Sequence, residues 1–196
     1  MIRRPLVPPA WIRAHWAALA VLVIAAAMIV TMRVEGRVWF CSCWQVMVWV
    51  ADAYSPHTSQ HLLDPYSWTH LQHGLLFFWA LVWLAPRWSW QTRLVAATVV
   101  EALWEIVENS PWVIARYREA TAALGYEGDS VVNSVGDLLA CAAGFAIAGR
   151  IGLRGTVALF IAIEAALAWW IRDTLLLNVV MLFYPIESIK QWQMAL

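Results

Sequence analysis

Three glutamates interrupt an otherwise apolar segment, EALWEIVENS, at positions 101 to 110. Glu101, Glu105 and Glu108 have the spacing that places side chains on one face of an α-helix. Carboxylates gathered on one helix face can divide acid and base roles when their pKa values are pushed apart, or they can bind a metal ion. Either chemistry needs partners from other elements.

Two further groups could supply these partners. Asp129, Asn133 and Asp137 follow one another at intervals of four residues, and His70 and His73 lie one helical turn apart. Histidines in this arrangement, facing carboxylates, could offer the nitrogen and oxygen ligands that zinc, manganese or iron accept. The candidate metal ligands are His70, His73, Glu105 and Asp129, and the candidate catalytic residues are Glu105, Glu108, Asp129, Asn133 and Asp137.

The residues leave two alternatives to a metal site open. Paired carboxylates could carry out metal-free acid and base chemistry. A proton-sharing and salt-bridge network could instead fix the helix register, with Arg116, Arg118 or Arg172 pairing the acids. The same arginines are candidate substrate-binding residues, because planar guanidinium groups fit anionic headgroups. Neither HExxH nor the Glu-x-x-His repeats of di-iron bundles are present, so no motif decides between these possibilities.

The composition defines the surroundings of these residues. Of the 196 residues, 62% are hydrophobic and only 13% are charged, and the mean hydropathy is +0.63. This mixture predicts an all-α, polytopic transmembrane helical bundle, a single integral domain with the lipid bilayer as its first partner. The formal net charge is zero and no lysine-rich tract occurs, which argues against nucleic acid as a partner.

We expect about five spans, at residues 17–33, 69–85, 93–109, 129–148 and 156–173. Residues 34–68 are expected to form an extracytoplasmic loop with a short amphipathic helix over 38–53, and residues 174–196 an interfacial or re-entrant tail. A cleavable signal peptide is the alternative for the first span. A retained anchor is favoured, because the apolar run ends in Met32, Arg33, Val34 and Glu35 and not in small residues.

Arginine placement orients this bundle. Arg3, Arg4 and Arg13 precede the first span, so the positive-inside rule predicts a cytoplasmic N-terminus and an extracytoplasmic C-terminus. At a rise of about 1.5 Å per residue, the acids and histidines then fall in the outer half of the bundle. A charged side chain at the bilayer centre costs about 2.5 to 3.5 kcal/mol. We therefore expect these side chains to line a polar cavity that opens to the extracytoplasmic side.

The three cysteines fall into two classes. Cys41 and Cys43, in FCSCW, lie outside the expected spans, where a disulfide across one intervening residue would be strained. One interpretation is a soft-metal or redox role, and the other is a pair of interfacial thiols packed beside tryptophans. Cys141 lies in the apolar part of the fourth span and is expected to serve packing.

Several stretches resemble one family. SQHLLDPYSWTHLQHG (59–74), EALWEIVENSPWVIARYREAT (101–121), YEGDSVVNSVGD (126–137) and IRDTLLLNVVMLFYPIESIKQWQ (171–193) are together similar to uncharacterised protein family 0314, domain of unknown function 2585. The FCSCW stretch is also similar, whereas Thr174 stands where the family often has Asn. The resemblance covers most of the chain after about Gly36. It implies a multi-pass protein of a proteobacterial inner membrane, and it implies no reaction, cofactor or catalytic residue.

Two functions of different classes follow as hypotheses. The first is a membrane enzyme, metal-dependent in one version, that acts on a lipid, lipid-linked or peptide substrate. It requires the histidines and at least two carboxylates to converge within ligand distance. The second is a non-catalytic accessory or assembly protein of a membrane complex, in which arginines and amides cap the carboxylates and no cavity opens. Transport is a weaker third hypothesis, because no internal repeat is evident.

Overall fold

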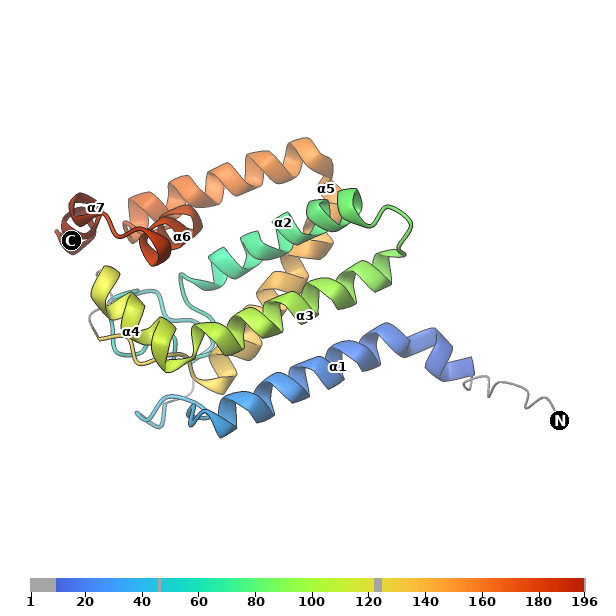
Figure 1. Ribbon diagram of the computed structural model, residues 1–196, viewed down its shortest axis with the longest axis horizontal. Coiled ribbons are helices and arrows are strands. Elements are labelled where there is room, and N and C mark those ends of the chain that lie inside the picture. Colours follow the sequence, from blue (N-terminus) through green and yellow to red (C-terminus); the bar gives the residue numbers. More distant parts are fainter. Residues whose placement is uncertain (1–9, 46, 122–124, 196) are drawn as a thin grey trace.

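The computed structural model describes residues 10–45, 47–121 and 125–195. Within these ranges the chain forms seven α-helices and no β-strand, as shown in Figure 1. The helices are α1 (Ala10–Val34), α2 (Ser67–Leu84), α3 (Trp90–Glu108), α4 (Pro111–Ala120), α5 (Val131–Trp170), α6 (Leu175–Phe183) and α7 (Glu187–Met194). The all-α prediction is thus confirmed.

Short polar side chains begin four of these helices. Ser89, Ser110, Ser130 and Thr174 each accept a hydrogen bond from the backbone N–H three residues later, at the starts of α3, α4, α5 and α6. Such caps satisfy one of the backbone donors that the first helical turn leaves free. The cap at Ser110 also separates α3 from α4, so that the chain changes direction directly after Glu108.

Helix α5 consists of two helices joined at Gly152. This residue has φ +70° and ψ 176°, a conformation that glycine adopts far more readily than other residues. In Figure 1 the chain reverses at this point, so the second half of α5 runs back toward the end from which the first half came. The reversal lies in the RIGLRG segment that separates the ranges 129–148 and 156–173.

Helix α2 packs against both halves of α5. A Cβ atom at Gly74 would clash with the backbone carbonyl of Cys141 on the first half, so the two helices approach closely here. On the second half, Trp79 Nε1 donates to Thr156 Oγ1 at 3.0 Å, and Gln72 Nε2 donates to Glu164 Oε1 at 3.0 Å. The apolar core between these helices is described by its buried members Leu75, Phe78, Ala97, Phe145, Ala148, Ile163, Leu167 and Ile171.

A second core attaches α1 to the remaining helices. Met28 and Met32 are buried against Ala102 of α3 and against Val131 and Leu138 of α5. The apolar contact continues into hydrogen bonds beyond α1, where an Arg37 Nη donates to the backbone carbonyl of Glu127. Helix α1 is therefore packed against the rest of the fold along its C-terminal half.

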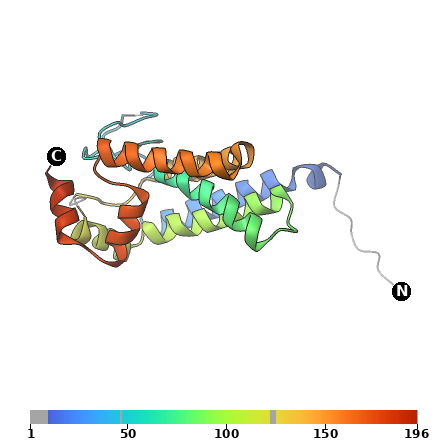
Figure 2. The same ribbon diagram turned by 90° about the horizontal axis from the view of Figure 1, so that it is seen from above.

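The connecting segments gather at one end of the helices. Figures 1 and 2 both show helices α4, α6 and α7 at this end, together with the loop that precedes α2. The α2–α3 connection and the Gly152 reversal lie at the other end. The expected amphipathic helix over 38–53 is wrong. The described residues of that range form turns and a parallel bridge between Trp49 and Leu63, because Trp49 pairs with a distant part of the loop and not with its own neighbours.

Among the residues that the structure describes, two helices are long and apolar enough to cross a membrane. They are His15–Val34 within α1 and Val131–Trp170, the two halves of α5 taken together. The length and composition of these helices suggest association with a membrane. Helices α2 and α3 occupy the ranges expected for two further spans, but histidines, a glutamine and three glutamates interrupt their apolar sequence. The expected number of five spans is therefore not established by length and composition.

Candidate functional site

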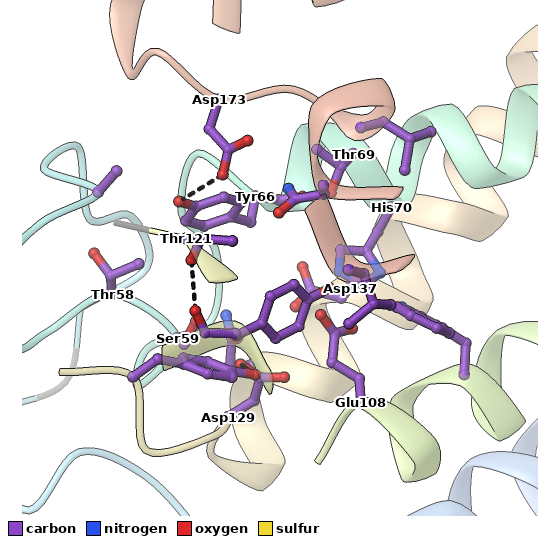
Figure 3. A pocket seen from close by; sticks show the side chains of 18 of the residues that line it. Thr58, Ser59, Tyr66, Thr69, His70, Glu108, Thr121, Asp129, Asp137 and Asp173 are labelled. Atoms are coloured by element: carbon purple, nitrogen blue, oxygen red, sulfur yellow. Dashed lines mark hydrogen bonds between the residues drawn. The ribbon is translucent and has the colours of Figure 1, made fainter. Parts of the chain in front are cut away.

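A cavity of about 860 Å³ lies at the end where the connecting segments gather. Its wall combines the loop before α2 with α2, α3, α4, the start of α5, α6 and α7. Polar side chains such as His70 and Asp137 share this wall with apolar ones such as Phe77, Trp104 and Leu182. Figure 3 shows His70, Glu108 and Asp137 turned toward the same space. The cavity can therefore receive a molecule that has both polar and apolar parts.

Two histidines on α2 meet Glu101 of α3 at the inner side of this cavity. His70 Nδ1 lies 2.6 Å from Glu101 Oε1, and His73 Nδ1 lies 3.0 Å from Glu101 Oε2. Glu101 is fully buried, whereas His70 and His73 also line the cavity. Both oxygens of this one carboxylate are thus occupied by imidazole nitrogens.

The other two glutamates of α3 are less completely bonded. His70 Nδ1 lies 3.2 Å from Glu105 Oε1, but its hydrogen bond is directed to Glu101, and both oxygens of Glu105 are buried without a hydrogen-bond partner. Oε2 of Glu108 is likewise buried without a hydrogen-bond partner. Buried carboxylate oxygens without donors are rare, and each calls for an unseen proton, water molecule or cation.

The ligand atoms of these side chains form two overlapping groups. His70, His73 and Glu101 make one group and His70, Glu105 and Glu108 make the other, with the candidate ligand atoms of each group within 4.8 Å of one another. Because His70 belongs to both groups, the five side chains constitute one continuous nitrogen and oxygen donor set. We call this set the cavity site.

Aspartates from three segments surround the cavity site. Ser67 Oγ donates to Asp137 Oδ1 at 2.7 Å and accepts from the backbone N–H of Asp64 at 3.2 Å. The Asp64 carboxylate accepts the backbone N–H groups of Ser59 and Tyr66, each at 2.7 Å. Burial raises the pKa of Asp64 above its ordinary value, and the Ser59 N–H opposes this effect. This chain of bonds connects the loop before α2 to α5.

Asp129 lies directly before α5, where amide and phenol groups hold it. Asn109 Nδ2 donates to Asp129 Oδ2 at 2.9 Å, and Tyr126 donates its hydroxyl hydrogen to Oδ1 at 3.0 Å. Burial raises the pKa of Asp129, while the bond from Asn109 acts in the opposite direction. Asn133, expected to accompany it, directs its Nδ2 to the backbone carbonyl of His61 at 2.8 Å.

Asp173, directly after α5, contributes a further acid to the cavity wall. Tyr66 donates its hydroxyl hydrogen to Asp173 Oδ2 at 3.4 Å, and the Thr174 N–H donates to Oδ1 at 2.9 Å, as Figure 3 shows for the first bond. Burial is the largest influence and raises the pKa of Asp173 to about 7. This carboxyl group therefore changes its charge near neutral pH.

The arginines do not pair with the cavity acids. Arg116 Nε donates to the Leu182 carbonyl at 2.8 Å, Arg118 Nε donates to the Tyr126 carbonyl, and Arg172 Nη1 donates to the Trp192 carbonyl at 3.0 Å. Over the described ranges the cavity wall contains no arginine. The alternative in which arginines pair these acids is thus wrong for Arg116, Arg118 and Arg172, because backbone carbonyls of α6, of the α4–α5 connection and of α7 take their guanidinium groups.

The structure brings together part of each residue set expected from the sequence. Of the candidate metal ligands, His70, His73 and Glu105 converge, whereas Asp129 is engaged by Asn109 and lies in neither ligand group. Glu101 takes its place. The spacing of Glu101, Glu105 and Glu108 on one helix face was the signal that could have identified it. The candidate catalytic residues Glu108, Asp129, Asn133 and Asp137 all line the cavity.

Comparison with known proteins extends over most of the chain. The model of a family described as "Protein of unknown function (DUF2585)" matches residues 32–195. A UPF0314 protein of Paracoccus denitrificans is 46% identical over 182 residues, which cover 93% of each chain. A UPF0314 protein of Rhizobium meliloti is 43% identical over 175 residues, 89% of each chain.

A UPF0314 protein of Sphingopyxis alaskensis is 46% identical over 182 residues, which cover 92% of this chain and 95% of the relative. No solved structure matches. The family model and these relatives agree in extent and in kind. The chain therefore belongs to the DUF2585 family, whose curated relatives are UPF0314 proteins.

Proposed function

We propose that this protein is a multi-pass inner-membrane enzyme that holds a divalent metal ion, zinc, manganese or iron, in the cavity site. Its substrate would be a lipid, a lipid-linked molecule or a peptide that enters from the extracytoplasmic side. The observation that carries the proposal is the set of buried carboxylate oxygens on Glu105 and Glu108 that have no donor, directly beside His70.

The membrane part of the proposal is supported by the exposure of the apolar helices. Only 11% of the residues in the apolar window of α1 and 17% in that of α5 are buried inside the protein, whereas the core helix of a soluble protein would be mostly buried. Bulky apolar side chains such as Leu22, Val30, Leu103 and Ile161 are exposed. Contact with lipid would remove the cost of exposing these side chains to water. Helices α1, α2, α3 and the two halves of α5 would then form a bundle of five spans.

The orientation is supported by the positions of charged residues. Arg87 and Arg93 lie at the α2–α3 connection, and Arg150 and Arg154 flank the Gly152 reversal, all at the end opposite the cavity. The positive-inside rule assigns that end to the cytoplasm. The cavity and its surrounding helices then face the extracytoplasmic side, and the C-terminus lies there too.

The negative charge of three neighbouring glutamates supports the proposed metal ion. Glu101, Glu105 and Glu108 would place several carboxylates in a buried space that lacks arginine and lysine over the described ranges. Protonated histidines can balance part of this charge, but Glu105 still has no hydrogen-bond donor. A divalent cation bound by imidazole and carboxylate groups would satisfy these oxygens and balance their charge together.

The reaction that we propose is a hydrolysis. A metal ion at such a site supplies Lewis acidity and a water molecule of lowered pKa. Asp137 and Asp129 on the cavity wall are placed to hold or move protons, and Phe77, Trp104 and Leu182 offer an apolar surface for an acyl or aliphatic chain. A cavity of about 860 Å³ is large enough for a substrate of that composition.

Metal analysis of the purified full chain tests the proposal. We expect a stoichiometric divalent metal in the wild-type protein and its loss in both His73→Ala and Glu105→Ala. Glu119→Gln is the matched control, because this glutamate side chain is 78% exposed on α4 and lies outside the cavity wall. Retention of metal in this control would show that the loss of metal from Glu105→Ala does not result from removing just any carboxylate.

A folded wild-type protein that contains no cavity metal would contradict the proposal. That result would favour the second candidate, a non-catalytic accessory or assembly protein of a membrane complex. The bonds Asn109–Asp129 and Asn133–His61 favour that candidate, because they satisfy polar groups entirely within the chain. Its partner would be another membrane protein, and copurification under mild detergent would detect it.

A further inference from the structure

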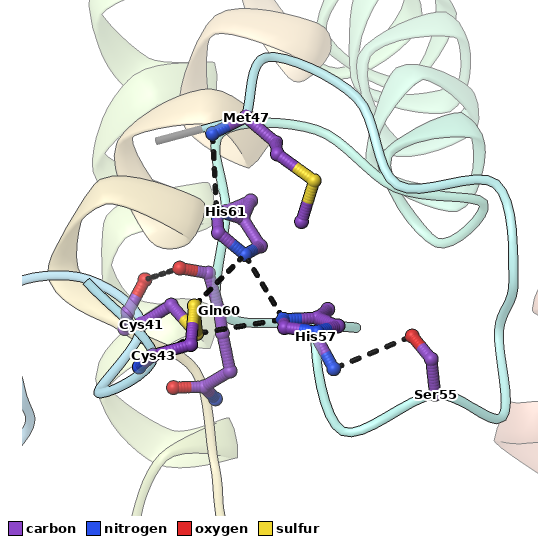
Figure 4. Close-up of a disulfide and its surroundings, with 8 residues drawn as sticks. Cys41, Cys43, Met47, Ser55, His57, Gln60 and His61 are labelled. Carbon is purple, nitrogen blue, oxygen red and sulfur yellow. Dashed lines mark hydrogen bonds between the residues drawn. A yellow bond between two sulfur atoms is a disulfide. The ribbon is translucent and has the colours of Figure 1, made fainter. Parts of the chain in front are cut away.

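A second group of metal-ligating side chains lies in the loop before α2, outside the cavity site. Cys41 and Cys43 are joined as a disulfide, and His57 and His61 stand next to them, as Figure 4 shows. The candidate ligand atoms of these four side chains lie within 4.8 Å of one another. We call this set the loop site.

Three separations within the loop site are close to the edges of a tetrahedral metal centre. With Zn–N bonds of about 2.05 Å and Zn–S bonds of about 2.3 Å, tetrahedral angles require N···N separations of about 3.4 Å and N···S separations of about 3.6 Å. His61 Nε2 lies 3.4 Å from His57 Nδ1, and Cys41 Sγ lies 3.6 Å from His57 Nδ1. Cys43 Sγ lies 3.9 Å from His61 Nε2. Once their bond is broken, the two sulfurs must move apart to about 3.8 Å, and the remaining ligand atoms already lie within 4.8 Å of one another.

The surroundings of the four ligands suit a structural metal. Cys41 and His61 are buried, and Cys43 and His57 are half-buried, so the centre would be enclosed on most sides. His61 presents its Nε2 to the other ligands, 3.4 Å from His57 Nδ1 and 3.9 Å from Cys43 Sγ. Metal binding through Nε2 requires the proton on Nδ1, at the cost of the 3.3 Å bond that Met47 N–H donates to that atom.

Backbone hydrogen bonds already bring the two ligand pairs together. The Cys41 N–H donates to the Gln60 carbonyl at 3.1 Å, and the Ser130 N–H donates to the Ser59 carbonyl at 2.8 Å. Asn133 holds the His61 carbonyl from α5. The ligands thus stand in place although the described residues of the loop form no regular helix or strand. Metal ions commonly stabilise small folds of this kind.

We propose that Cys41, Cys43, His57 and His61 form a zinc site when the cysteines are reduced, and that the disulfide is the metal-free form of the same site. A phosphine or thiol reductant supplies two electrons, two protons come from solvent, and the disulfide becomes two thiols. Zinc then replaces both thiol protons and binds two thiolates and two neutral imidazoles. Tetrahedral S₂N₂ donor sets of this kind favour zinc among the divalent ions.

The site would control the wall of the cavity. Ser42 lies between the two cysteines, and Thr58, Ser59 and Gln60 lie between the two histidines, and all four line the cavity. A metal centre would fix these two segments relative to each other. This inference is independent of the cavity metal, because the two ligand sets share no residue.

Cobalt(II) is the probe that tests this site, since its bonds to thiolate absorb in the near ultraviolet. The full chain in detergent is reduced with a phosphine until a thiol assay detects all three cysteines as free thiols, and Co²⁺ is then added. We expect one equivalent of Co²⁺ to produce thiolate-to-cobalt absorption, which Zn²⁺ abolishes by displacement. His61→Gln should weaken Co²⁺ binding more than about tenfold.

Three comparisons assign the signal. Cys41→Ser should abolish it, Cys141→Ser should retain it, and Glu105→Ala should retain it because the cavity site lies elsewhere. Oxidised wild-type protein, which needs no substitution and keeps the fold described here, should show none. A fully reduced, folded wild-type protein without the absorption would overturn the inference, as would its persistence in the Cys41→Ser Cys43→Ser double variant.

Discussion

The cavity site and the loop site each contain a pair of closely spaced histidines, yet they differ in donor atoms and in support. His70 and His73 stand on α2 opposite the carboxylates of α3, whereas His57 and His61 stand in a loop opposite two sulfurs. The first set suits an oxygen-preferring or borderline cation and the second a thiolate-preferring one. Two similar pairs of imidazoles are thus suited to different metal ions, because carboxylates face one pair and sulfurs face the other.

The support of each site also decides what a metal would do there. Helix α2 is held by the core and by its close approach to Cys141, so the cavity site exists before any ion arrives. The loop site depends on a few backbone hydrogen bonds and on Asn133. We therefore expect a cavity metal to serve chemistry, and a loop metal to contribute mainly to folding stability.

The response to pH should separate the two regions most strongly. The pKa of Asp173 is about 7, above its ordinary value of 3.8, so the folded state binds a proton more tightly than the unfolded state. Its contribution to stability is complete below about pH 4 and is lost as the pH rises through 7. The difference is on the order of 4 kcal/mol. Asp173→Asn should flatten this part of the profile of melting temperature against pH, and an unchanged slope would contradict the assignment.

Acidification should destabilise the zinc-bound loop, because protons compete with zinc for the thiolates. Removing zinc from the reduced protein with a chelator should cost about 2.7 kcal/mol when zinc was present at a hundredfold excess over its dissociation constant. Protease cleavage within residues 35–66 should rise about a hundredfold, with cleavage between α2 and α3 unchanged. Equal rises at both positions would show that the loop does not respond separately.

Glu105→Gln should change stability with opposite signs in the two metal states. Without metal, the neutral amide removes a buried carboxylate that lacks donors, and the melting temperature should rise by the equivalent of about 1 to 3 kcal/mol. With the cavity metal present, the same substitution removes a ligand and should lower it. Thermal melts before and after chelation measure both effects. The same sign in both states would mean that Glu105 does not bind the ion.

The smallest expected effect concerns the contact between the two regions. Asn133→Ala removes the 2.8 Å bond to the His61 carbonyl and should destabilise the protein by about 1 kcal/mol. Cobalt binding by the reduced loop should weaken, whereas the cavity metal should be retained. Titrations of both sites in this one variant provide the check. Loss of the cavity metal would mean that Asn133 supports the cavity site directly.

The sequence predicted helices at the positions of α1, α2, α3 and both halves of α5, and it singled out several residues of the cavity site. The spacing of Glu101, Glu105 and Glu108 fixes a common helix face, and His70 with His73 does the same on another helix. These local relations survive folding, because each follows from helix geometry alone. The convergence of the two faces then follows from the cost of burying such groups without polar partners.

The remaining features depend on contacts between distant segments, which periodicity does not encode. Asp129 was expected among the ligands, but Asn109 at the end of α3 engages it. The sequence suggested a soft-metal or redox role for Cys41 and Cys43, but it did not pair them with His57 and His61, because an irregular segment separates the two pairs. The expected helix over 38–53 failed for the same reason, since its backbone bonds to the loop beyond it.

X-ray absorption spectroscopy at the metal edge of the Cys41→Ser Cys43→Ser variant tests the central claim most directly, because only the cavity site can then bind. We expect stoichiometric metal with nitrogen and oxygen neighbours, imidazole scattering and no sulfur, and loss of that metal on adding Glu105→Ala. Folded protein that stays free of metal after incubation with zinc, manganese and iron(II) would contradict the claim that the unpaired carboxylates of α3 mark a cation site.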